Sequence, residues 1–563
     1  MKVVIVGGVA GGASAAARLR RLDEEAEILV FERSGYMSYA NCGLPYYIGG
    51  SITEQRALTL QSPQSFWSRF RVQVKVRHEV AAIDRVQKTV TVRALDSGEV
   101  WEESYDKLIL APGARPIIPD LPGIGSKRVY TLRTVEDTLQ IREKAAGSGA
   151  KSAVIIGGGF VGVEMAENLK ELGLAVTLVE KADQLLGQLD KDMASFIHAH
   201  IRSKGVELLL KSELTGFEET ADGILVKLDG ERALEASIAI LAIGVRPDST
   251  LAADAGLALG VRGTIEVNEH MQTSDPDIYA VGDAVSVPHL VTGEKMAVLL
   301  AGPANKQGRI AADNIAGLWT VYKGAAASSV VKVFEMTAAS TGINERTAKA
   351  AGIPYDKIIV APASHASYYP GGRVMTIKLL FGQEVGKILG AQIVGFDGVD
   401  KRIDVIAAVM QTGGTVEALP ELDLAYAPPY SSAKDPVNMA GFAAENARTG
   451  KVNQFFYEDL AGLGASGATL LDVRTDTEYS AGHAEGFELH IPVDELRERL
   501  DELDKSKPVY VMCQSGLRSY IACRILTAAG YTCYNFAGGY RFYASVKNDE
   551  LNEEANTDCG LKC

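Results

Sequence analysis

Apolar residues form uninterrupted runs at three places in the chain, where they do not alternate with polar ones. The runs are KVVIVGG (2–8), KSAVIIGGG (151–159) and VYVMCQSG (509–516). Runs of Val and Ile without alternation are typical of parallel strands covered on both faces. Helical segments follow the first two runs, and second apolar strands come next at 26–32 and 175–180. The pattern therefore predicts two βαβ units about 150 residues apart, which is a duplicated nucleotide-binding architecture.

The hydrophobic pattern changes after residue 326. The segments VVKVFEMTAASTGI and RVMTIKLLFGQEVGKILGAQIVG are typical of antiparallel strands with helices beside them. We interpret TGKVNQFFYEDL (449–460) as a link. A further α/β module begins at ATLLDVRTDTEYSAGHAEG and ends near Lys547, and a polar, acidic stretch follows.

Composition narrows the class of protein. A chain of 563 residues is too long to fold around one hydrophobic core. At roughly 100–200 residues per domain, we expect three to five domains. The net charge of −14 argues against nucleic acid or an anionic membrane as the main partner. No signal-peptide pattern opens the chain, and no apolar stretch approaches the roughly 20 residues of a membrane span. Six cysteines are too few for a disulfide scaffold, and no His/Cys cluster suggests a metal, so we expect a cytoplasmic protein without a metal site.

The loop GGGFVG after the strand at 151–159 fits G-x-G-x-x-G, with Gly157, Gly159 and Gly162 at the fixed positions. Glycines there permit a tight turn and the close approach of a pyrophosphate to a helix N-terminus. Glu180 ends the next strand, where a carboxylate bonds a ribose 2′-hydroxyl and repels a 2′-phosphate. The alternative is an ordinary glycine turn beside a surface glutamate. The combination favours NADH over NADPH.

The first loop is less regular, because Val9 occupies the place of the middle glycine. Glu32 nevertheless ends the next strand, and TSDPDIYAVGDA (273–284) resembles the second flavin motif of two-dinucleotide flavoproteins, in which Asp283 would bond the ribityl chain of FAD. LILAPGARP and AILAIGVRPD resemble the crossover segments of the same proteins. FAD is therefore expected at the first loop, with a single structural nucleotide site as the alternative. The loop itself comprises Gly7, Gly8, Val9, Ala10, Gly11 and Gly12.

A lone cysteine, Cys42, follows the first loop in SYANCGLPYYIGG. This segment and YAPPYSSAKDPVNMAG (426–441) resemble coenzyme A-disulfide reductase, and the first 450 residues resemble the pyridine nucleotide–disulfide oxidoreductases. Many of those proteins carry C-x4-C beside the flavin, but Met37 stands at the matching position, so Cys42 cannot form that internal disulfide. A lone thiolate can attack a sulfur–sulfur bond and hold half the substrate, or accept one sulfur atom as a persulfide. We expect its pKa to be lowered by positive charge, helix N-termini or the flavin. A buried structural cysteine is the alternative.

The resemblance also implies ligand contacts. Ser14, Arg18 and Arg21 share one helix face by their spacing and would meet the phosphates of coenzyme A, a solvated face being the alternative. Ser38 and Asn41 would orient the substrate sulfur or the pantetheine arm. The remaining contacts implied are Arg71 (or Arg69) and Lys434 for coenzyme A, and Arg33, Asn41, Val80 and Ala301 for FAD.

Two tyrosines resemble family residues that reach the partner subunit's active site. They are Tyr368 in SYYPGG, where Tyr369 competes for the assignment, and Tyr426 in LAYAPP. Their hydroxyls would stabilise or protonate a departing thiolate. The implied enzyme is a homodimer.

The segment CQSGLRS (513–519) lies between a predicted strand and a helix. C-x4-R at such a turn makes a cradle of backbone N–H groups that stabilises an anion. With LLDVRTDTEYSAGHAEG and FAGGY it resembles a rhodanese domain, which implies a persulfide on Cys513 and Arg518 closing the loop. A C-x5-R phosphatase needs one more loop residue, and an inactive rhodanese-like module is the other alternative. The remaining cysteines are interpreted as core residues, Cys523 and Cys533, and as tail thiols without an assigned role, Cys559 and Cys563.

The expected fold class is α/β, with two Rossmann-like FAD/NAD(P)-binding domains, an α+β dimerisation domain and a C-terminal α/β rhodanese domain. The predicted boundaries are 1–110 with 248–325 for FAD, 111–247 for NAD(P)H, 326–448 for dimerisation, 455–547 for the rhodanese and 548–563 for a polar tail.

Four functions are compatible with these motifs. The leading prediction is a flavoprotein that uses NADH to reduce persulfides or polysulfides, such as coenzyme A persulfide, to a thiol and hydrogen sulfide at Cys42, while Cys513 handles sulfane sulfur. The others are a coenzyme A-disulfide reductase with an auxiliary rhodanese, a sulfurtransferase acting from Cys513, and an NADH oxidase or peroxidase. The last has Gly11 and Gly12 where those relatives place a histidine beside the flavin, and it leaves the rhodanese module unexplained.

Overall fold

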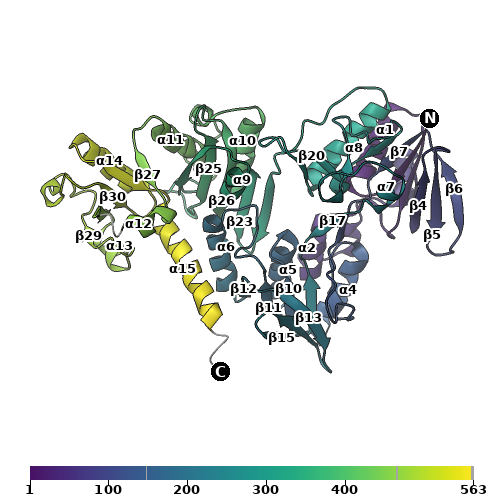
Figure 1. Ribbon diagram of the computed structural model, residues 1–563, viewed down its shortest axis with the longest axis horizontal. Helices are drawn as coiled ribbons and strands as arrows, with labels where there is room; N and C mark the ends of the chain where they lie inside the picture. The colour runs from purple at the N-terminus through teal and green to yellow at the C-terminus, as the bar shows by residue number, and fades with distance from the viewer. Residues whose placement is uncertain (148, 464–466, 559–563) are drawn as a thin grey trace. The chain divides into compact units, whose positions relative to one another are not determined.

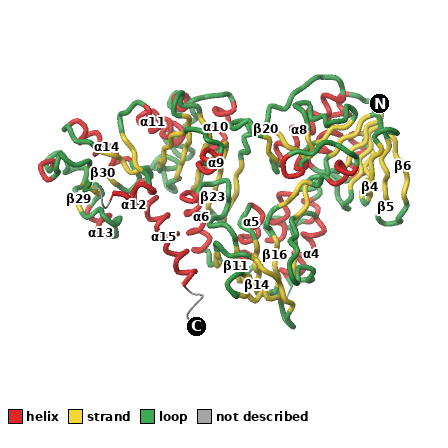
Figure 2. The backbone as a smooth tube through the Cα atoms, in the orientation of Figure 1, coloured by secondary structure: helices red, strands yellow, loops and turns green. Residues whose placement is uncertain are grey.

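The computed structural model describes residues 1–147, 149–463 and 467–558 (Figures 1 and 2). The chain folds into two compact units. Unit 1 contains Met1–Lys181 and Lys211–Ala327. Unit 2 contains Ala182–Leu210 and the chain from Ser328 onward.

The first sheet of unit 1 is parallel, with strand order β3-β2-β1-β7-β19. Val3, Val4 and Ile5 on β1 are fully buried, as the uninterrupted apolar run predicts. An antiparallel meander of β4, β5 and β6, three neighbouring strands in Figure 2, and a small sheet of β18, β20 and β21 complete this domain. The strands are β1 (Lys2–Val6), β2 (Glu27–Glu32), β3 (Gln73–Val76), β4 (His78–Asp84), β5 (Thr89–Ala94), β6 (Val100–Ser104), β7 (Lys107–Leu110), β18 (Ile265–Glu266), β19 (Ile278–Ala280), β20 (Val285–Pro288) and β21 (Lys295–Ala297); the helices are α1 (Ala10–Leu22), α2 (Leu44–Gly49), α3 (Pro63–Phe70), α7 (Thr250–Asp254) and α8 (Ala301–Ile315).

The second sheet of unit 1 repeats this plan with parallel strands in the order β11-β10-β16-β9. An antiparallel pair, β8 with β17, joins the two domains where the crossover segments were predicted. A meander of β13, β14 and β15 lies after the second βαβ unit. The elements are β8 (Ala114–Pro116), β9 (Val129–Tyr130), α4 (Val135–Ala146), β10 (Ser152–Ile156), α5 (Phe160–Glu171), β11 (Ala175–Val179), β13 (Leu214–Glu219), β14 (Ile224–Leu228), β15 (Ala233–Ala236), β16 (Ile238–Leu241) and β17 (Val245–Pro247). The duplicated nucleotide-binding architecture is confirmed.

Unit 2 contains an antiparallel sheet with strand order β22-β23-β26-β25-β24, as the change of pattern after residue 326 predicted. Helix α10 packs against β23 and β26, and α11 against β24. The elements are β22 (Ser329–Val333), β23 (Met336–Gly342), α9 (Glu345–Ala350), β24 (Tyr355–Val360), β25 (Thr376–Gly382), β26 (Ile388–Gly395), α10 (Val399–Gln411) and α11 (Pro436–Arg448).

The C-terminal module of unit 2 has a parallel sheet with strand order β27-β31-β30-β28-β29. The prediction that 449–460 is only a link was wrong, because residues 453–455 pair with β31; three residues are too few to reveal a strand by periodicity. Helix α15 continues past Lys547 into the predicted polar tail. Cys559 and Cys563 lie outside the described residues. The elements are β27 (Asn453–Phe455), α12 (Leu460–Leu463), β28 (Thr469–Asp472), α13 (Asp476–Ser480), β29 (Leu489–His490), β30 (Val509–Met512), α14 (Leu517–Ala528), β31 (Cys533–Phe536) and α15 (Gly539–Asp558).

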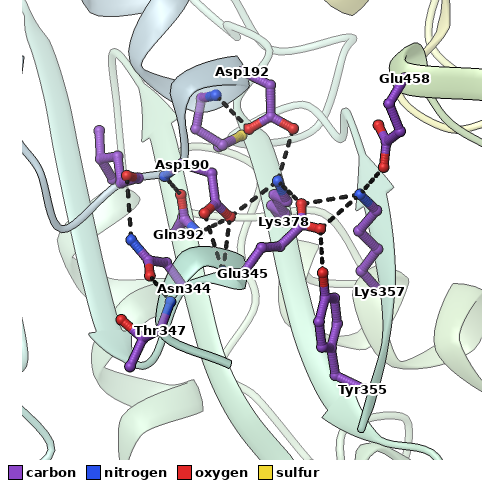
Figure 3. Close-up of polar contacts among 12 residues, drawn as sticks. Asp190, Asp192, Asn344, Glu345, Thr347, Tyr355, Lys357, Lys378, Gln392 and Glu458 are labelled. Atoms are coloured by element: carbon purple, nitrogen blue, oxygen red, sulfur yellow. Dashed lines mark hydrogen bonds and ion pairs between the residues drawn. The ribbon is translucent and has the colours of Figure 1, made fainter. Parts of the chain in front are cut away.

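Residues 182–210, predicted within the NAD(P)H domain, group with unit 2 and carry α6 (Lys191–Ser203) and β12 (Glu207–Leu209). A buried ion cluster accounts for this placement (Figure 3). The fully buried ammonium of Lys378 on β25 lies 3.0 Å from Asp190, 2.7 Å from Asp192 and 2.5 Å from Glu345. Burial alone would raise the pKa of Glu345, but Lys378 and Lys357 outweigh it and lower that pKa to about 2. The cluster therefore joins 182–210 to the antiparallel sheet through charges that neither segment can bury alone.

Helix α15 lies alongside α6 (Figure 1). His198 on α6 is fully buried; its Nε2 accepts a hydrogen bond from the Leu185 N–H at 3.0 Å, and its Nδ1 lies 2.7 Å from Asp549 on α15. Because Nε2 of His198 accepts a hydrogen bond, the proton of the imidazole lies on Nδ1, which donates to the carboxylate of Asp549. Arg202 adds a contact of 2.6 Å to the same Asp549. The last helix of the rhodanese-like module is thus anchored on a segment about 350 residues earlier in the chain.

Candidate active sites

The two glycine-rich loops of unit 1 have the same construction. A Cβ atom at Gly12 would lie 1.9 Å from the Gly7 oxygen, and one at Gly162 would lie 1.8 Å from the Gly157 oxygen, so both helices start in direct contact with their loops. The Gly8 N–H donates to Glu32 at 2.8 Å, and the Gly158 N–H donates to Glu180 at 2.6 Å. Val9 precedes α1 as its N-terminal cap, so its departure from the glycine pattern leaves the turn unchanged.

A cleft opens at the first loop and fits a dinucleotide. Its polar lining consists of the carboxylate of Glu32 at a strand end, backbone groups of the loop, and arginines. A carboxylate suits the ribose of an adenosine, and backbone N–H groups with arginines suit a pyrophosphate. Asp283 lies in η4 (Gly282–Ala284), against which α8 packs, and Ala301 begins α8. Of the residues predicted to bind FAD, the lining includes Gly7, Val9, Glu32, Arg33, Asn41 and Val80.

The loop that carries Cys42 is fastened to the first glycine loop. The Ser38 N–H donates to the Gly8 oxygen at 2.8 Å, and Ser38 adopts a left-handed φ of +44° to make this turn. Cys42 lies in the short helix η1 (Asn41–Gly43) and is exposed. The thiol is therefore exposed, next to Asn41 of the cleft lining, and is not buried in the core as the structural interpretation requires.

Arg133 is a site residue that the sequence did not reveal. Its guanidinium lies 3.0 Å from Asp283 and lines the cleft. The amide of Asn41, oriented to satisfy both of its atoms, donates to the Arg133 main-chain oxygen and accepts from Arg133 Nη1, each at 3.1 Å. Asn41, Arg133 and Asp283 thus connect the Cys42 loop with the second flavin motif. The segment TLRT around Arg133 has no distinctive pattern, so only the fold brings these residues together.

Contrary to expectation, the groups of the chain itself raise the pKa of Cys42 on balance. Desolvation by the protein atoms around this exposed loop raises it most, the carboxylates of Glu164 and Asp283 add to that effect, and the guanidinium of Arg133 opposes them. Glu164 is a second residue that the sequence reasoning missed. Its signal was its place two residues after Gly162, on helix α5, which packs against the helix α2 that follows the Cys42 loop.

The residues predicted to contact coenzyme A are spread over both units. On α1, Ser14 donates to Asn305, Arg18 pairs with the buried Asp313 at 2.6 Å, and Arg21 is exposed. The guanidinium of Arg71 lies 5.5 Å from the ring centre of Trp67. In unit 2, Lys434 is exposed just before α11. The structure thus brings Ser14 and Arg18 together on one face of α1, and Arg18 is already paired.

Tyr368 and Tyr426 form a pair. Their hydroxyl oxygens are 2.6 Å apart, and both side chains are exposed. This hydrogen bond raises the pKa of Tyr426. Tyr369 instead packs its ring edge-on against His365, so the geometry favours Tyr368 over Tyr369 as the partner of Tyr426.

The loop after β30 forms the predicted cradle around Cys513. The fully buried Sγ accepts hydrogen bonds from the Gly516 N–H at 3.1 Å and from the Ser519 hydroxyl at 3.2 Å. The guanidinium of Arg518 forms a bidentate ion pair with the carboxylate of Glu478, with both N–O distances at 2.7 Å. This pairing lowers the pKa of Glu478 to about 2. Cys523 and Cys533 lie in the core of this module. The arrangement stabilises negative charge on a sulfur atom at Cys513.

A cavity of about 460 Å³ within unit 2 borders both the domain of the antiparallel sheet and this loop. Its lining includes Lys434, Met439 and Phe442 from the first, and Ser515 and Gly516 from the Cys513 loop. A ligand with one anionic group and an apolar arm would fit this lining.

Across the described ranges, no set of three or more His, Cys, Asp or Glu side chains is arranged to hold a metal ion. Within the same ranges, no helix has both the length and the apolar composition to cross a membrane.

Comparison with known families agrees with this geometry. The family model described as pyridine nucleotide-disulphide oxidoreductase matches residues 1–308, and the model of its dimerisation domain matches 328–436. A rhodanese-like domain model matches 457–545. The chain belongs to the pyridine nucleotide-disulphide oxidoreductase family, a class of oxidoreductases that use FAD and NAD(P)H, and carries a C-terminal rhodanese-like domain.

Individual relatives narrow the resemblance. The chain is 36% identical over 445 residues to the coenzyme A disulfide reductase of Staphylococcus aureus (strain JH9), which covers 79% of this chain and 100% of that protein. The crystal structure of reduced CoADR-RHD from Bacillus anthracis is 48% identical, covers 97% of this chain and 98% of that one, and superposes with a TM-score of 0.95. The NAD-dependent persulfide reductase from A. fulgidus is 39% identical, covers 96% of this chain and 100% of that one, and has a TM-score of 0.91.

Proposed function

We propose that this protein is an NADH-dependent reductase of persulfides and polysulfides, with coenzyme A persulfide or a similar species as substrate. The observation that carries the proposal is a single exposed thiol, Cys42, beside the dinucleotide cleft of a chain that also holds the cradled Cys513. The other described cysteines lie in the rhodanese-like core. Similarity to a persulfide reductase and to a coenzyme A disulfide reductase supports the substrate class.

The chemistry needs one nucleophile and two electrons. The Cys42 thiolate attacks the inner sulfur of R–S–SH, the sulfur–sulfur bond breaks, and hydrosulfide leaves, which gives a Cys42–S–S–R mixed disulfide. Two electrons from NADH and one proton then return Cys42 to its thiolate and release R–SH. Attack on the outer sulfur gives a Cys42 persulfide and a departing thiol instead, with the same electron count.

Several features of the chain support the binding part of the proposal. Glu180, already bonded to its glycine loop, favours NADH because a carboxylate repels a 2′-phosphate. Ser14, Arg18 and Arg21, with Arg71 and Lys434, would meet the phosphates of coenzyme A. Ser38 and Asn41 would orient its sulfur. In a homodimer with 326–448 as the interface, Tyr368 and Tyr426 would reach the partner subunit's Cys42 and protonate the departing thiolate.

The experiment that tests the proposal is anaerobic NADH oxidation with coenzyme A persulfide, coenzyme A disulfide and oxygen as rival acceptors, with sulfide assayed. We expect the persulfide to give the highest kcat/KM, with one sulfide released for each NADH consumed. A preference of tenfold for the disulfide or for oxygen, about 1.4 kcal/mol in transition-state energy, would make the enzyme a disulfide reductase or an oxidase instead.

Replacing Cys513 by serine distinguishes a reductase from a sulfurtransferase. We expect turnover of small persulfides to stay within about twofold of wild type and the use of bulk polysulfide to fall at least tenfold, because only the latter needs sulfur loaded at Cys513. Rates are read as sulfide release with each donor. Loss of both activities together would favour the sulfurtransferase.

A further inference from the structure

The cavity of about 460 Å³ in unit 2 is bordered by the edges of two sheets. Strand β24 is the outermost strand of the antiparallel sheet, and β27 is the outermost strand of the rhodanese-like sheet. Residues 358–360 of β24 and Gln454 of β27 both belong to the cavity lining. An edge strand leaves the backbone groups of its outer side without a strand partner, so such a cavity suits an extended ligand that carries amide groups.

A buried hydrogen-bond acceptor in this lining lacks a partner. Asn535 on β31 is 9% exposed and lines the cavity, and its Oδ1 atom forms no hydrogen bond within the part of the chain that the structure describes. Buried polar side chains are nearly always hydrogen-bonded, so an acceptor left free at a cavity wall indicates a donor group that enters the cavity. The N–H of a ligand amide is such a donor.

Other residues of the lining define the two ends of the ligand. Gly516, whose N–H donates to Cys513 Sγ at 3.1 Å, belongs to the lining, so one residue contacts both the reactive sulfur and the cavity. Lys434 is exposed and is the only lysine or arginine among the described lining residues, so it can pair with one anionic group. Asn446 on α11 donates to the Tyr520 hydroxyl on α14 at 3.4 Å, and this bond joins the two sides of the cavity.

We propose that this cavity binds a small peptide-like thiol, which takes the sulfane sulfur from Cys513. An amide N–H of the thiol donates to Asn535 Oδ1, and its single carboxylate pairs with Lys434 when coenzyme A does not. Most of the residues proposed above for the phosphates of coenzyme A lie in unit 1, and one lysine does not match several phosphates, so the occupant is a separate and smaller thiol. The inference rests on the proposed role of Cys513 as a sulfur carrier and names its acceptor.

The transfer needs no oxidant or reductant. The acceptor loses its thiol proton to solvent, and its thiolate R–S⁻ attacks the outer sulfur of the persulfide Cys513–S–SH. A new sulfur–sulfur bond gives R–S–SH, while the old one breaks and leaves its electron pair on Cys513 Sγ. The hydrogen bonds from Gly516 and Ser519 stabilise the thiolate that remains. The product is a persulfide of the kind that the reductase site is proposed to consume.

The test follows sulfur transfer in the full-length, FAD-loaded chain with Cys42→Ser and without NADH, so that no reduction takes place. Cys513 is loaded with inorganic polysulfide, the excess is removed, and the loss of one sulfur atom from the intact chain is followed by mass spectrometry. A chain that also carries Cys513→Ser gives the blank. The acceptors are N-acetylcysteine, which has an amide and a carboxylate, N-acetylcysteamine, which has only the amide, and ethanethiol, which has neither.

We expect Asn535→Leu to lower the rate at low thiol concentration about threefold to tenfold with both amide thiols, because one hydrogen bond is lost. Lys434→Met should lower the rate about twofold to fivefold with N-acetylcysteine alone, because only this acceptor has a carboxylate. Neither substitution should change transfer to ethanethiol. An equal fall with all three acceptors would show damage to the Cys513 loop and would overturn the proposal.

The matched control is Asn548→Leu, which changes an exposed asparagine on α15 of the same module and should leave every rate as it was. Equal rates for the control, Asn535→Leu and Lys434→Met would contradict the inference. Transfer to coenzyme A that is about tenfold faster than to N-acetylcysteine would also contradict it, since the cavity would then belong to the coenzyme A site. A Cys513 that takes up no sulfur would overturn its proposed role and this inference together, whereas a loaded Cys513 without any dependence on Asn535 or Lys434 overturns the inference alone.

Discussion

Cys42→Ser is expected to lower kcat/KM for sulfide release from coenzyme A persulfide by at least about 10³-fold, because a serine hydroxyl is a poor nucleophile toward sulfur at neutral pH. The glycine loops and the Glu32 and Glu180 contacts do not involve the thiol, so binding of FAD and its bleaching by NADH should persist. Stopped-flow absorbance measures the bleaching, and a sulfide assay measures turnover.

The control for this experiment is Cys513→Ser, which removes the other candidate nucleophile and should keep turnover of the small persulfide. If Cys42→Ser retained more than a tenth of the wild-type sulfide release, the electrons would have another route to the substrate. The assignment of Cys42 as nucleophile would then be wrong.

Lys378→Met should destabilise unit 2 by about 3–5 kcal/mol, because it leaves Asp190, Asp192 and Glu345 buried without their shared cation. Global unfolding of so large a chain is not two-state, so local opening is the better measure. Hydrogen exchange should accelerate by about two to four orders of magnitude in peptides from β25 and α6.

The pH dependence of this loss follows from the lowered pKa of Glu345. A carboxyl whose folded pKa is about 2 adds stability above its ordinary pKa of 4.5 and loses it as pH falls toward 2. The difference between wild type and Lys378→Met should therefore shrink at acid pH. Lys349→Met is the control, because Lys349 is 69% exposed and lies 3.8 Å from the same Glu345; it should change exchange less than threefold. Equal effects of the two substitutions would show that the cluster is not what holds 182–210 to the sheet.

Sequence patterns predicted the sheets well because uninterrupted apolar runs and glycine turns are local signals. β1, β10 and β30 lie inside the three predicted runs, and the helices start where the loops predicted. The short strand β27 was missed because three residues carry no period. The placement of 182–210 was missed because Asp190 and Asp192 find Lys378 more than 180 residues away, a pairing that no local pattern encodes.

The candidate sites divide in the same way. Residues in motifs, such as Cys42, Glu32, Glu180 and Cys513, lie where the motifs place them. Arg133 stands in an unremarkable segment, and only the fold brings it to Asn41 and Asp283. The charges of the chain do not supply the expected lowering of the pKa of Cys42, because Glu164 on α5 and Asp283 in η4 raise that pKa and Arg133 alone opposes them.

The dependence of α6 on α15 has a consequence for biosynthesis. His198 leaves the ribosome about 350 residues before Asp549, the carboxylate that covers it. At translation rates of about 5–20 residues per second, the covering helix arrives roughly 20–70 seconds later. During that interval α6 carries an uncovered face with Phe196 on it, which is a surface that chaperones recognise. Shortening the message before the codons of α15 would make that transient exposure permanent, and we expect such a product to accumulate in aggregates even though the oxidoreductase domains are fully encoded.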